Sequence, residues 1–370
     1  MSESTSALEQ SPNFPGIGVY SGLVSTVLGP VPVEELGITL MHEHIFLDAS
    51  VWWQEPAEGS RRHIAHQPLN MAILGELRMD PFVNLDNTKL YDPEVAVREL
   101  LQFQELGGQT VVDVTNVGIG RDPSALQRIS RRTGLKIICG AGYYLDGSHP
   151  PHVRAMRPDD IAEEIIRDVV EGIPGTNVKA GIIGEIGVGI EFTPEEKKIL
   201  RGAARAAAQT QAALTIHMPG WKRRGHEVLD IVAEEGGDLA HTILDHMNPS
   251  LYDFEYQAGL AERGAFLEYD MIGMDYFYAD QQAQSPSDEE NAAAIKRLID
   301  AGYLHSLLLS QDVFLKMMLT CYGGWGYGYI LRHFVPRLRR HGVTDEQIQT
   351  LLVENPRRAF SARHRQGAGQ

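Results

Sequence analysis

The sequence predicts an α/β protein and, within that class, a (β/α)8 TIM barrel. From residue 37 onward, short β-rich runs alternate with helical segments, and most of the runs are continuously apolar, as in parallel strands buried on both faces. The 370 residues are enough for such a barrel as one domain. The eight expected strands are 38–45, 109–115, 135–142, 178–186, 212–218, 241–247, 265–271 and 306–313.

A doubly wound open sheet is the alternative fold. It normally carries a glycine-rich first turn with the order G-x-G-x-x-G. The glycines of 181–189 (GIIGEIGVG) lack that order and lie in mid-chain. The barrel is therefore the better interpretation.

Helix boundaries between the expected strands carry recognisable capping residues. Asp92-Pro93 opens a helix that Gly107-Gly108 closes, because Asp caps free N–H groups, Pro suits the first turn and Gly tolerates a left-handed stop. Thr193 with Glu196 forms a capping box before a second helix. These signals place helices after the strands, as a barrel requires.

Segments outside the repeating pattern are expected to belong to one domain spanning 16–362. Residues 16–36 have the pattern of a short N-terminal β-hairpin ahead of the barrel, and residues 48–91 form a long insert after the first strand. We expect the insert to lie over the carboxyl-terminal face as a lid. Residues 1–15 are expected to be a disordered tail and residues 363–370 a flexible one.

Composition excludes several classes of partner. The formal net charge is −16 and no basic tract occurs, so we expect no nucleic-acid and no membrane partner. The two cysteines, Cys139 and Cys321, suggest no disulfide framework, and no run of about 18 apolar residues occurs. We expect the first residues to be a disordered tail and not a signal peptide. The expected location is cytoplasmic and the expected partner is a small molecule.

Two histidines end the first expected strand, in the stretch GITLMHEHI (37–45). Residues i and i+2 of a strand face the same side, so His42 and His44 point together into the barrel. Burying two imidazoles without partners is costly, and neutral imidazole is the commonest metal ligand. The pair indicates half of a metal site, although two hydrogen-bonded core histidines would show the same pattern.

Later strands carry further ligand types near their carboxyl-terminal ends, where barrel enzymes build their active sites. These residues are Glu185, His217, His246 and Asp312. With His42 and His44 they exceed the needs of one tetrahedral zinc and suit two divalent metal ions, with zinc expected. We expect His42, His44 and Asp312 at one metal and His217 and His246 at the other. Glu185 and a shared hydroxide would bridge both, and Asp312 would take the proton of the attacking hydroxide.

These motifs, in this order, resemble the phosphotriesterase family of the amidohydrolase superfamily over residues 23 to 360. The family's bacterial phosphotriesterases and lactonases bridge their metals with a carboxylated lysine, whereas this chain has Glu185 in IIGEIG. That glutamate resembles the phosphotriesterase homology proteins and, more closely, the phosphotriesterase-related (parathion-hydrolase-related) proteins. ICGAGYYLD and FLEYDMIGMD look like the pattern of the latter group. The resemblance implies a metal-dependent hydrolase and a homodimer.

Substrate contacts are predicted from the loops that follow the strands. Tyr144 follows strand 3 and is expected to line the pocket. Lys222 and Arg223 follow strand 5 and could receive an anionic group. Asp270 ends strand 7 and could orient a metal ligand or a leaving group.

The leading functional hypothesis is hydrolysis of small carboxylic esters or lactones, with side activity on organophosphorus esters. The alternative is hydrolysis of N-acyl amides such as N-acyl amino acids or N-acyltaurines, which the basic loop after strand 5 favours. A non-catalytic ligand-binding barrel is the third hypothesis, and a missing metal ligand would support it. None of the six candidate ligands is missing.

Overall fold

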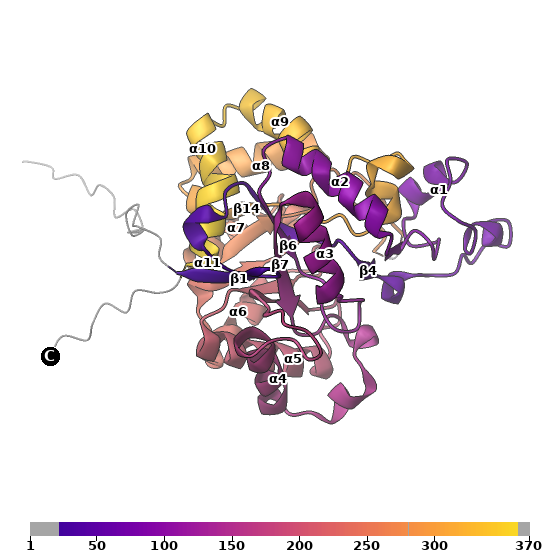
Figure 1. Ribbon diagram of the computed structural model, residues 1–370. Coiled ribbons are helices and arrows are strands. Elements are labelled where there is room, and N and C mark those ends of the chain that lie inside the picture. The colour runs from indigo at the N-terminus through magenta and orange to yellow at the C-terminus, as the bar shows by residue number, and fades with distance from the viewer. Residues whose placement is uncertain (1–21, 280, 362–370) are drawn as a thin grey trace, which may run out of the picture.

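The computed structural model describes residues 22–279 and 281–361, and they form the predicted TIM barrel (Figure 1). Eight parallel strands follow one another in the order β14-β11-β10-β9-β8-β7-β6-β3. Their bounds are β3 (Thr39–Glu43), β6 (Thr110–Asp113), β7 (Lys136–Ala141), β8 (Ile182–Gly187), β9 (Leu214–His217), β10 (Thr242–Leu244), β11 (Phe266–Tyr269) and β14 (Leu307–Leu309).

Helices follow the strands in the chain and surround them (Figure 1). Asp92 and Thr193 accept the expected backbone N–H groups at the starts of α2 and α5. The helices are α2 (Pro93–Glu105), α3 (Pro123–Thr133), α4 (Pro158–Val170), α5 (Pro194–Thr210), α6 (Gly225–Glu234), α7 (Phe254–Glu262) and α8 (Asp288–Asp300). After β14 come η11 (Ile330–Phe334), α9 (Val335–Arg340), α10 (Asp345–Gln349), η12 (Thr350–Glu354) and α11 (Asn355–Phe360).

The predicted hairpin closes the amino-terminal end of the barrel. Strands β1 (Leu23–Thr26) and β2 (Gly29–Pro32) pair antiparallel, and the Val27 N–H donates to the Ile137 carbonyl at the start of β7. Apolar side chains of the hairpin region join those inside the barrel in one buried cluster, which includes Val24, Val33, Leu36, Met41, Val112, Ile138, Ile182, Ile243, Phe266 and Leu308. This end of the barrel is therefore a packed core and not an opening.

The long insert lies at the other end. Its first and last parts pair as β4 (Leu47–Asp48) and β5 (Lys89–Leu90), and α1 (Leu74–Met79) lies between them. In Figure 1 the α1 segment extends away from the barrel, on the side opposite to β1 and α11. A short hairpin, β12 (Phe277–Tyr278) and β13 (Ala283–Gln284), follows β11. The predicted tails, 1–15 and 363–370, lie outside the described residues, as do residues 16–21 of the segment predicted to form the hairpin and residue 362 of the predicted domain.

Several barrel strands are shorter or less regular than the sequence suggests. Strands β10 and β14 end at Leu244 and Leu309, before the candidate ligands His246 and Asp312. Both of these residues have positive backbone φ angles, 55° and 44°, which an extended strand does not allow. In addition, β3 and β8 each contain one extra residue relative to the strand beside them, at Met41–His42 and Gly184–Glu185.

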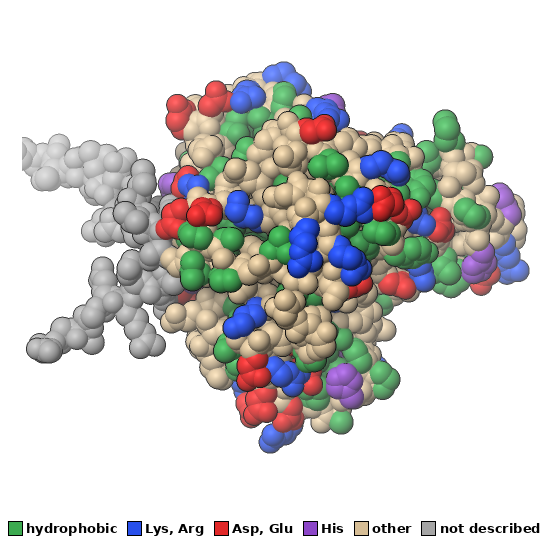
Figure 2. All heavy atoms as spheres, in the orientation of Figure 1, with side chains coloured by type: hydrophobic (Ala, Val, Ile, Leu, Met, Phe, Trp, Pro, Cys, Tyr) green, Lys and Arg blue, Asp and Glu red, His purple; other side chains and the backbone are tan. Residues whose placement is uncertain are grey.

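The surface carries charges of both signs. On the face seen in Figure 2, Lys and Arg side chains are interspersed with Asp and Glu. Among the helices described for this chain, none combines the length and apolar character needed to cross a bilayer.

Candidate metal centre and its pocket

The six predicted ligands meet at the carboxyl-terminal end of the barrel. His42 lies on β3 and His44 directly after it, Glu185 is on β8, and His217 ends β9. All six side chains are buried or nearly so; the exposed fractions of whole residues run from 0% for His42 to 8% for His217. The fold therefore brings together side chains from five strands that are up to 270 residues apart in sequence.

Glu185 lies between the two halves of the cluster. Its Oε1 is 3.3 Å from His44 Nε2, and its Oε2 is 3.1 Å from His217 Nδ1. Oε2 is also 3.6 Å from His42 Nε2 and 3.8 Å from His246 Nε2. One carboxylate therefore faces all four histidines, which is the position that a bridging ligand needs.

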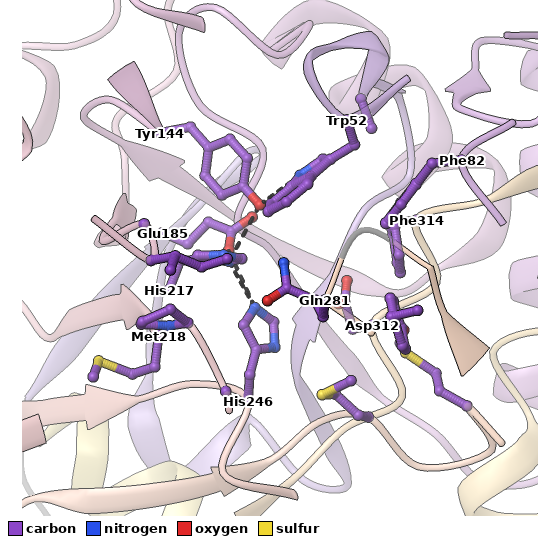
Figure 3. A pocket seen from close by; sticks show the side chains of 18 of the residues that line it. Trp52, Phe82, Tyr144, Glu185, His217, Met218, His246, Gln281, Asp312 and Phe314 are labelled. Atoms are coloured by element: carbon purple, nitrogen blue, oxygen red, sulfur yellow. Dashed lines mark hydrogen bonds and ion pairs between the residues drawn. The ribbon is translucent and has the colours of Figure 1, made fainter. Parts of the chain in front are cut away.

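Asp312 approaches the other side of the histidine pair. Its Oδ1 is 3.4 Å from His44 Nε2 and 3.8 Å from His42 Nε2. On the opposite side, His246 Nε2 lies 2.7 Å from His217 Nδ1 (Figure 3). Asp312 thus lies beside the His42–His44 pair and His217 lies beside His246. His42, His246 and Asp312 also approach one another closely enough to form one group, so the assignment of ligands to two ions stays a prediction.

The donor set fits divalent metal ions. Three groups, namely His42–His44–Glu185, His42–His246–Asp312 and Glu185–His217–His246, each place their ligand atoms within 4.8 Å of one another. His42 Nε2 and Asp312 Oδ1 are buried and have no hydrogen-bond partner in the described part of the chain. Imidazole nitrogen and carboxylate oxygen are the ligand types of catalytic zinc sites, and unpartnered buried donors of this kind are costly unless a cation binds them.

The cluster titrates as a strongly interacting unit. Burial alone would lower the pKa of His44, but the carboxylates of Asp312 and Glu185, 3.4 and 3.3 Å from its Nε2, outweigh burial and raise that pKa from 6.5 to about 9. Burial alone would raise the pKa of Glu185, but the surrounding histidines hold it well below its usual range. By contrast, burial and the neighbouring His246 lower the pKa of His217.

Three carboxyl groups lie behind the histidines, away from the pocket, and are fully buried. Asp270 Oδ1 is 3.0 Å from His246 Nδ1, and its Oδ2 is 3.4 Å from His42 Nδ1. Asp245 Oδ2 is 3.5 Å from the same His42 nitrogen. Burial, with Asp245 and Asp270 nearby, raises the pKa of Glu268 well above its usual range and so favours its protonated form.

An open pocket of about 790 Å³ lies over the cluster. The insert supplies Trp52 and Phe82, whose rings stack 5.5 Å apart, and the loop after β14 supplies Phe314 (Figure 3). Besides the candidate ligands His44, Glu185, His217, His246 and Asp312, the lining residues are Leu47, Ala49, Trp52, Phe82, Ile119, Tyr144, Gly189, Ile190, Met218, Pro219, Gly220, Trp221, Met271, Met274, Tyr278, Gln281 and Phe314.

Of the predicted substrate contacts, Tyr144 lines the pocket. Its hydroxyl lies 3.2 Å from His217 Nδ1 and accepts a 3.1 Å hydrogen bond from Trp52 Nε1. Burial, followed by the charge of Glu185, raises the pKa of Tyr144 well above its usual value, so the hydroxyl keeps its proton.

Lys222, Arg223 and Asp270 do not line the pocket. Lys222 is exposed, and Arg223 forms a 3.1 Å ion pair with Asp253 while its guanidinium lies over the Tyr256 ring. Local partners on α7 and its cap thus hold the Arg223 side chain away from the site. Asp270 lies beneath the histidines, where it orients candidate ligands, and cannot touch a substrate in the pocket.

Sequence reasoning missed several residues of the site. Tyr278 on β12 and Phe314 in the loop after β14 line the pocket and belong to no recognised motif. Met271 and Met274 also line it; they lie in the FLEYDMIGMD stretch, but as apolar residues they gave no sign of a binding site. Asp245 and Glu268 were also missed. Both are carboxylates within an apolar run that was expected to be a strand. Asp245 directly precedes His246, and Glu268 lies two residues before Asp270, so this pattern could have indicated them.

Similarity to known proteins extends over nearly the whole chain. A family model described as the phosphotriesterase family matches residues 22–360. An N-acetyltaurine hydrolase from Tetraodon nigroviridis is 36% identical over 341 residues, which cover 91% of this chain and 97% of that protein.

Two solved structures are similar to this fold. The first is described as a resiniferatoxin-binding protein from Rhodobacter sphaeroides. Its TM-score is 0.91 at 55% sequence identity, covering 93% of this chain and 96% of that one. The second is a lactonase from Listeria monocytogenes, with a TM-score of 0.75 at 26% identity over 92% of this chain and 99% of that one.

Proposed function

The chain belongs to the phosphotriesterase family and is a metal-dependent hydrolase, and from this premise we propose that it hydrolyses uncharged carboxylic esters or lactones that carry a bulky apolar group. The observation that carries the proposal is the apolar pocket over the histidine–carboxylate cluster. A lactonase is among the similar solved structures, which supports this substrate class.

The pocket lining favours an uncharged substrate. Aromatic and aliphatic side chains form most of its wall, and Gln281 is one of the few polar side chains there besides the candidate ligands. Among the described residues that line the pocket, none is Lys or Arg. A buried anionic group needs a cation or several hydrogen-bond donors to replace its water shell, so an apolar group binds there at lower cost.

Six residues would hold two divalent metal ions. His42, His44 and Asp312 would hold one ion, His217 and His246 the other, and Glu185 would bridge the two with one oxygen on each side. When bound, such ions would polarise the substrate's carbonyl and lower the pKa of a bound water. The separations between ligand atoms, 2.7 to 3.8 Å, suit ligands that share one small site.

Asp312 and Tyr144 are the protein groups placed to move or hold a proton. Asp312 lines the pocket, and its Oδ1 can take the proton of the attacking water and return it to the leaving oxygen. The Tyr144 hydroxyl stays protonated beside His217 and can donate a hydrogen bond to a substrate oxygen. The Trp52 N–H fixes its orientation.

Hydrolysis of N-acyl amides is the second candidate, because similar proteins are named N-acetyltaurine hydrolase. A taurine leaving group carries a sulfonate. The basic residues predicted to bind such an anion, Lys222 and Arg223, lie outside the pocket lining. The pocket therefore favours the ester and lactone class over this candidate.

A hydrolysis panel tests the choice. Zinc-loaded protein would be given aryl esters and alkyl lactones of increasing chain length, N-acetyltaurine, and an uncharged N-acetyl amide of similar size. We expect kcat/KM to rise with apolar chain length in the esters and lactones, and a chelator to abolish turnover. Faster turnover of N-acetyltaurine than of any ester or lactone would overturn the proposal, and the uncharged amide separates leaving-group charge from amide chemistry.

A further inference from the structure

The barrel has a seam between its first and last strands. Backbone pairing runs from β3 through six strands to β14, and no backbone ladder joins β14 to β3 among the described residues. The two strands are nevertheless neighbours, since the His42 N–H donates to the Ser310 hydroxyl at 3.1 Å. Side-chain hydrogen bonds, and not a backbone ladder, therefore join β3 to β14. This is where candidate ligands from the start and from the end of the chain come together.

Glu43 is the main connection across this seam. It lies between His42 and His44 and is fully buried. Its Oε1 accepts from the Ser310 hydroxyl at 2.7 Å, and from the backbone and side-chain N–H groups of Gln311 at 3.2 and 3.1 Å. Its Oε2 accepts from the Val313 N–H at 2.8 Å. The Glu43 carboxylate thus accepts four hydrogen bonds from the segment that follows β14.

These four bonds surround Asp312. The two backbone N–H groups that Glu43 accepts belong to the residues directly before and after it. Asp312 has a φ of 44°, a left-handed conformation that is strained for a non-glycine residue and persists only where its surroundings enforce it. Glu43 supplies that enforcement, because it fixes the backbone on both sides of the strained residue.

The connection continues from Gln311 to His44. The Gln311 side chain donates to the Tyr327 carbonyl at 2.8 Å and accepts from the Ile330 N–H at 3.1 Å. The Tyr327 hydroxyl in turn donates to the His44 carbonyl at 2.6 Å. Asp312 and His44 are therefore held in one buried network although 268 residues separate them.

We propose that Glu43 is a positioning residue that closes the barrel seam and holds Asp312 against His42 and His44. Glu43 does not line the pocket, so it acts through Asp312 and not on a substrate. The inference rests on the proposed function in one respect, because that function assigns Asp312 the roles of proton acceptor and metal ligand. The glutamate between the two histidines thereby gains a role distinct from theirs.

The test is Glu43→Gln, because glutamine has the same shape but replaces one acceptor oxygen with a donor NH2. In either amide orientation, that NH2 faces the N–H of Gln311 or of Val313. We expect kcat to fall about 10- to 100-fold with KM within about twofold, as for a misplaced catalytic group. We also expect the visible absorption spectrum of the cobalt-substituted protein to shift, because Asp312 is displaced.

Glu99→Gln is the matched control. Glu99, on α2, is also a buried glutamate, and it accepts from the N–H and hydroxyl of Thr320 and from the Cys321 N–H, away from the pocket. The Glu99→Gln substitution should lower the melting temperature of the protein while leaving kcat and the cobalt spectrum unchanged. If Glu43→Gln behaves in the same way as this control, Glu43 is only structural and the proposal is overturned.

Ser310→Ala is the variant to use if Glu43→Gln does not fold. This substitution removes one of the four hydrogen bonds that Glu43 accepts. It should shift the cobalt spectrum in the same direction with a loss in kcat of about 3- to 10-fold; an unchanged spectrum and kcat would overturn the proposal. The cobalt readout needs no substrate. A wild-type protein inactive on every ester and lactone would therefore refute the proposed function, while a shifted spectrum in Glu43→Gln would still support the role of Glu43.

Discussion

Asp312 combines the properties that a proton acceptor needs: it lines the pocket, its Oδ1 lacks a hydrogen-bond partner in the described chain, and His44 lies 3.4 Å away. Asp312→Asn keeps the shape of the side chain but removes its basicity. We expect kcat to fall by about 10²–10⁴-fold while the circular dichroism spectrum stays that of a folded barrel. Hydrolysis at the wild-type rate by this variant would refute the proposed proton transfer.

The carboxyl groups behind the histidines differ in their charge state. Burial raises the pKa of Glu268 well above its usual range and favours the protonated form, so Glu268→Gln should change kcat by less than about twofold. Asp270→Asn is the contrasting variant, since His246 and His42 lower the pKa of Asp270 against the effect of burial and it faces both of their Nδ1 atoms. We expect it to weaken metal binding about 10- to 100-fold, measured by competition with a chromogenic chelator. Equal effects of the two substitutions would contradict this assignment.

At the scale of elements, the strand order and helix caps followed from the sequence because they depend on local patterns. Continuous apolar runs mark parallel strands, and the caps of α2 and α5 lie within four residues of each helix start. The extra residues in β3 and β8 could not be predicted in this way. A bulge depends on how many residues the neighbouring strand supplies, which no local pattern records.

The pocket was predictable only in outline for a related reason. The insert was identified as a lid, but the contacts that make it one join segments far apart in the chain, such as Phe82 with Phe314 at a ring distance of 6.1 Å. The loop after β9 lines the pocket with Trp221, but the side chains of Lys222 and Arg223 lie outside the lining. Sequence spacing does not show which way a loop side chain points, and for Arg223 the direction depends on Asp253 and Tyr256, at the start of α7.

Trp52 gives the insert a testable role in selectivity. Its ring stacks on Phe82, and its N–H orients Tyr144. Trp52→Ala should raise KM about tenfold or more for bulky apolar esters, with a smaller effect on acetate esters, because a loss of about 1.4 kcal/mol of contact energy is a factor of ten. Trp52→Phe keeps an aromatic ring, so its KM for bulky esters should stay close to that of the wild-type protein. A loss in Trp52→Ala that does not depend on substrate size would argue against a selective lid.

For the whole molecule, protons and metal ions compete for the same histidines. In the metal-free protein the pKa of His44 is about 9, above the unperturbed 6.5. Its protonation therefore stabilises the folded state fully below about pH 6.5, and this contribution is lost as the pH rises through about 9. Metal ions bind the neutral imidazole, so their binding strengthens over the same interval.

The melting temperatures of zinc-loaded and chelator-treated protein should consequently diverge between pH 6.5 and 9. Metal binding stabilises the folded protein by mass action, so the loaded form should melt higher at each pH. The difference should grow with pH, as measured by differential scanning fluorimetry at constant free zinc. A difference that stays constant or shrinks over this range would contradict the assigned protonation of the histidine cluster.

Strand β1 and helix α11 lie on the side of the barrel opposite to α1 of the insert (Figure 1), and the insert residues Trp52 and Phe82 line the pocket. Both described chain ends therefore leave the molecule on the side remote from the mouth of the site. A carrier bead, a fluorescent reporter or a second enzyme joined at either end should leave the approach of a large ester unobstructed. The fold is thus suited to use as an immobilised catalyst, attached by its closed end with its pocket facing the solution.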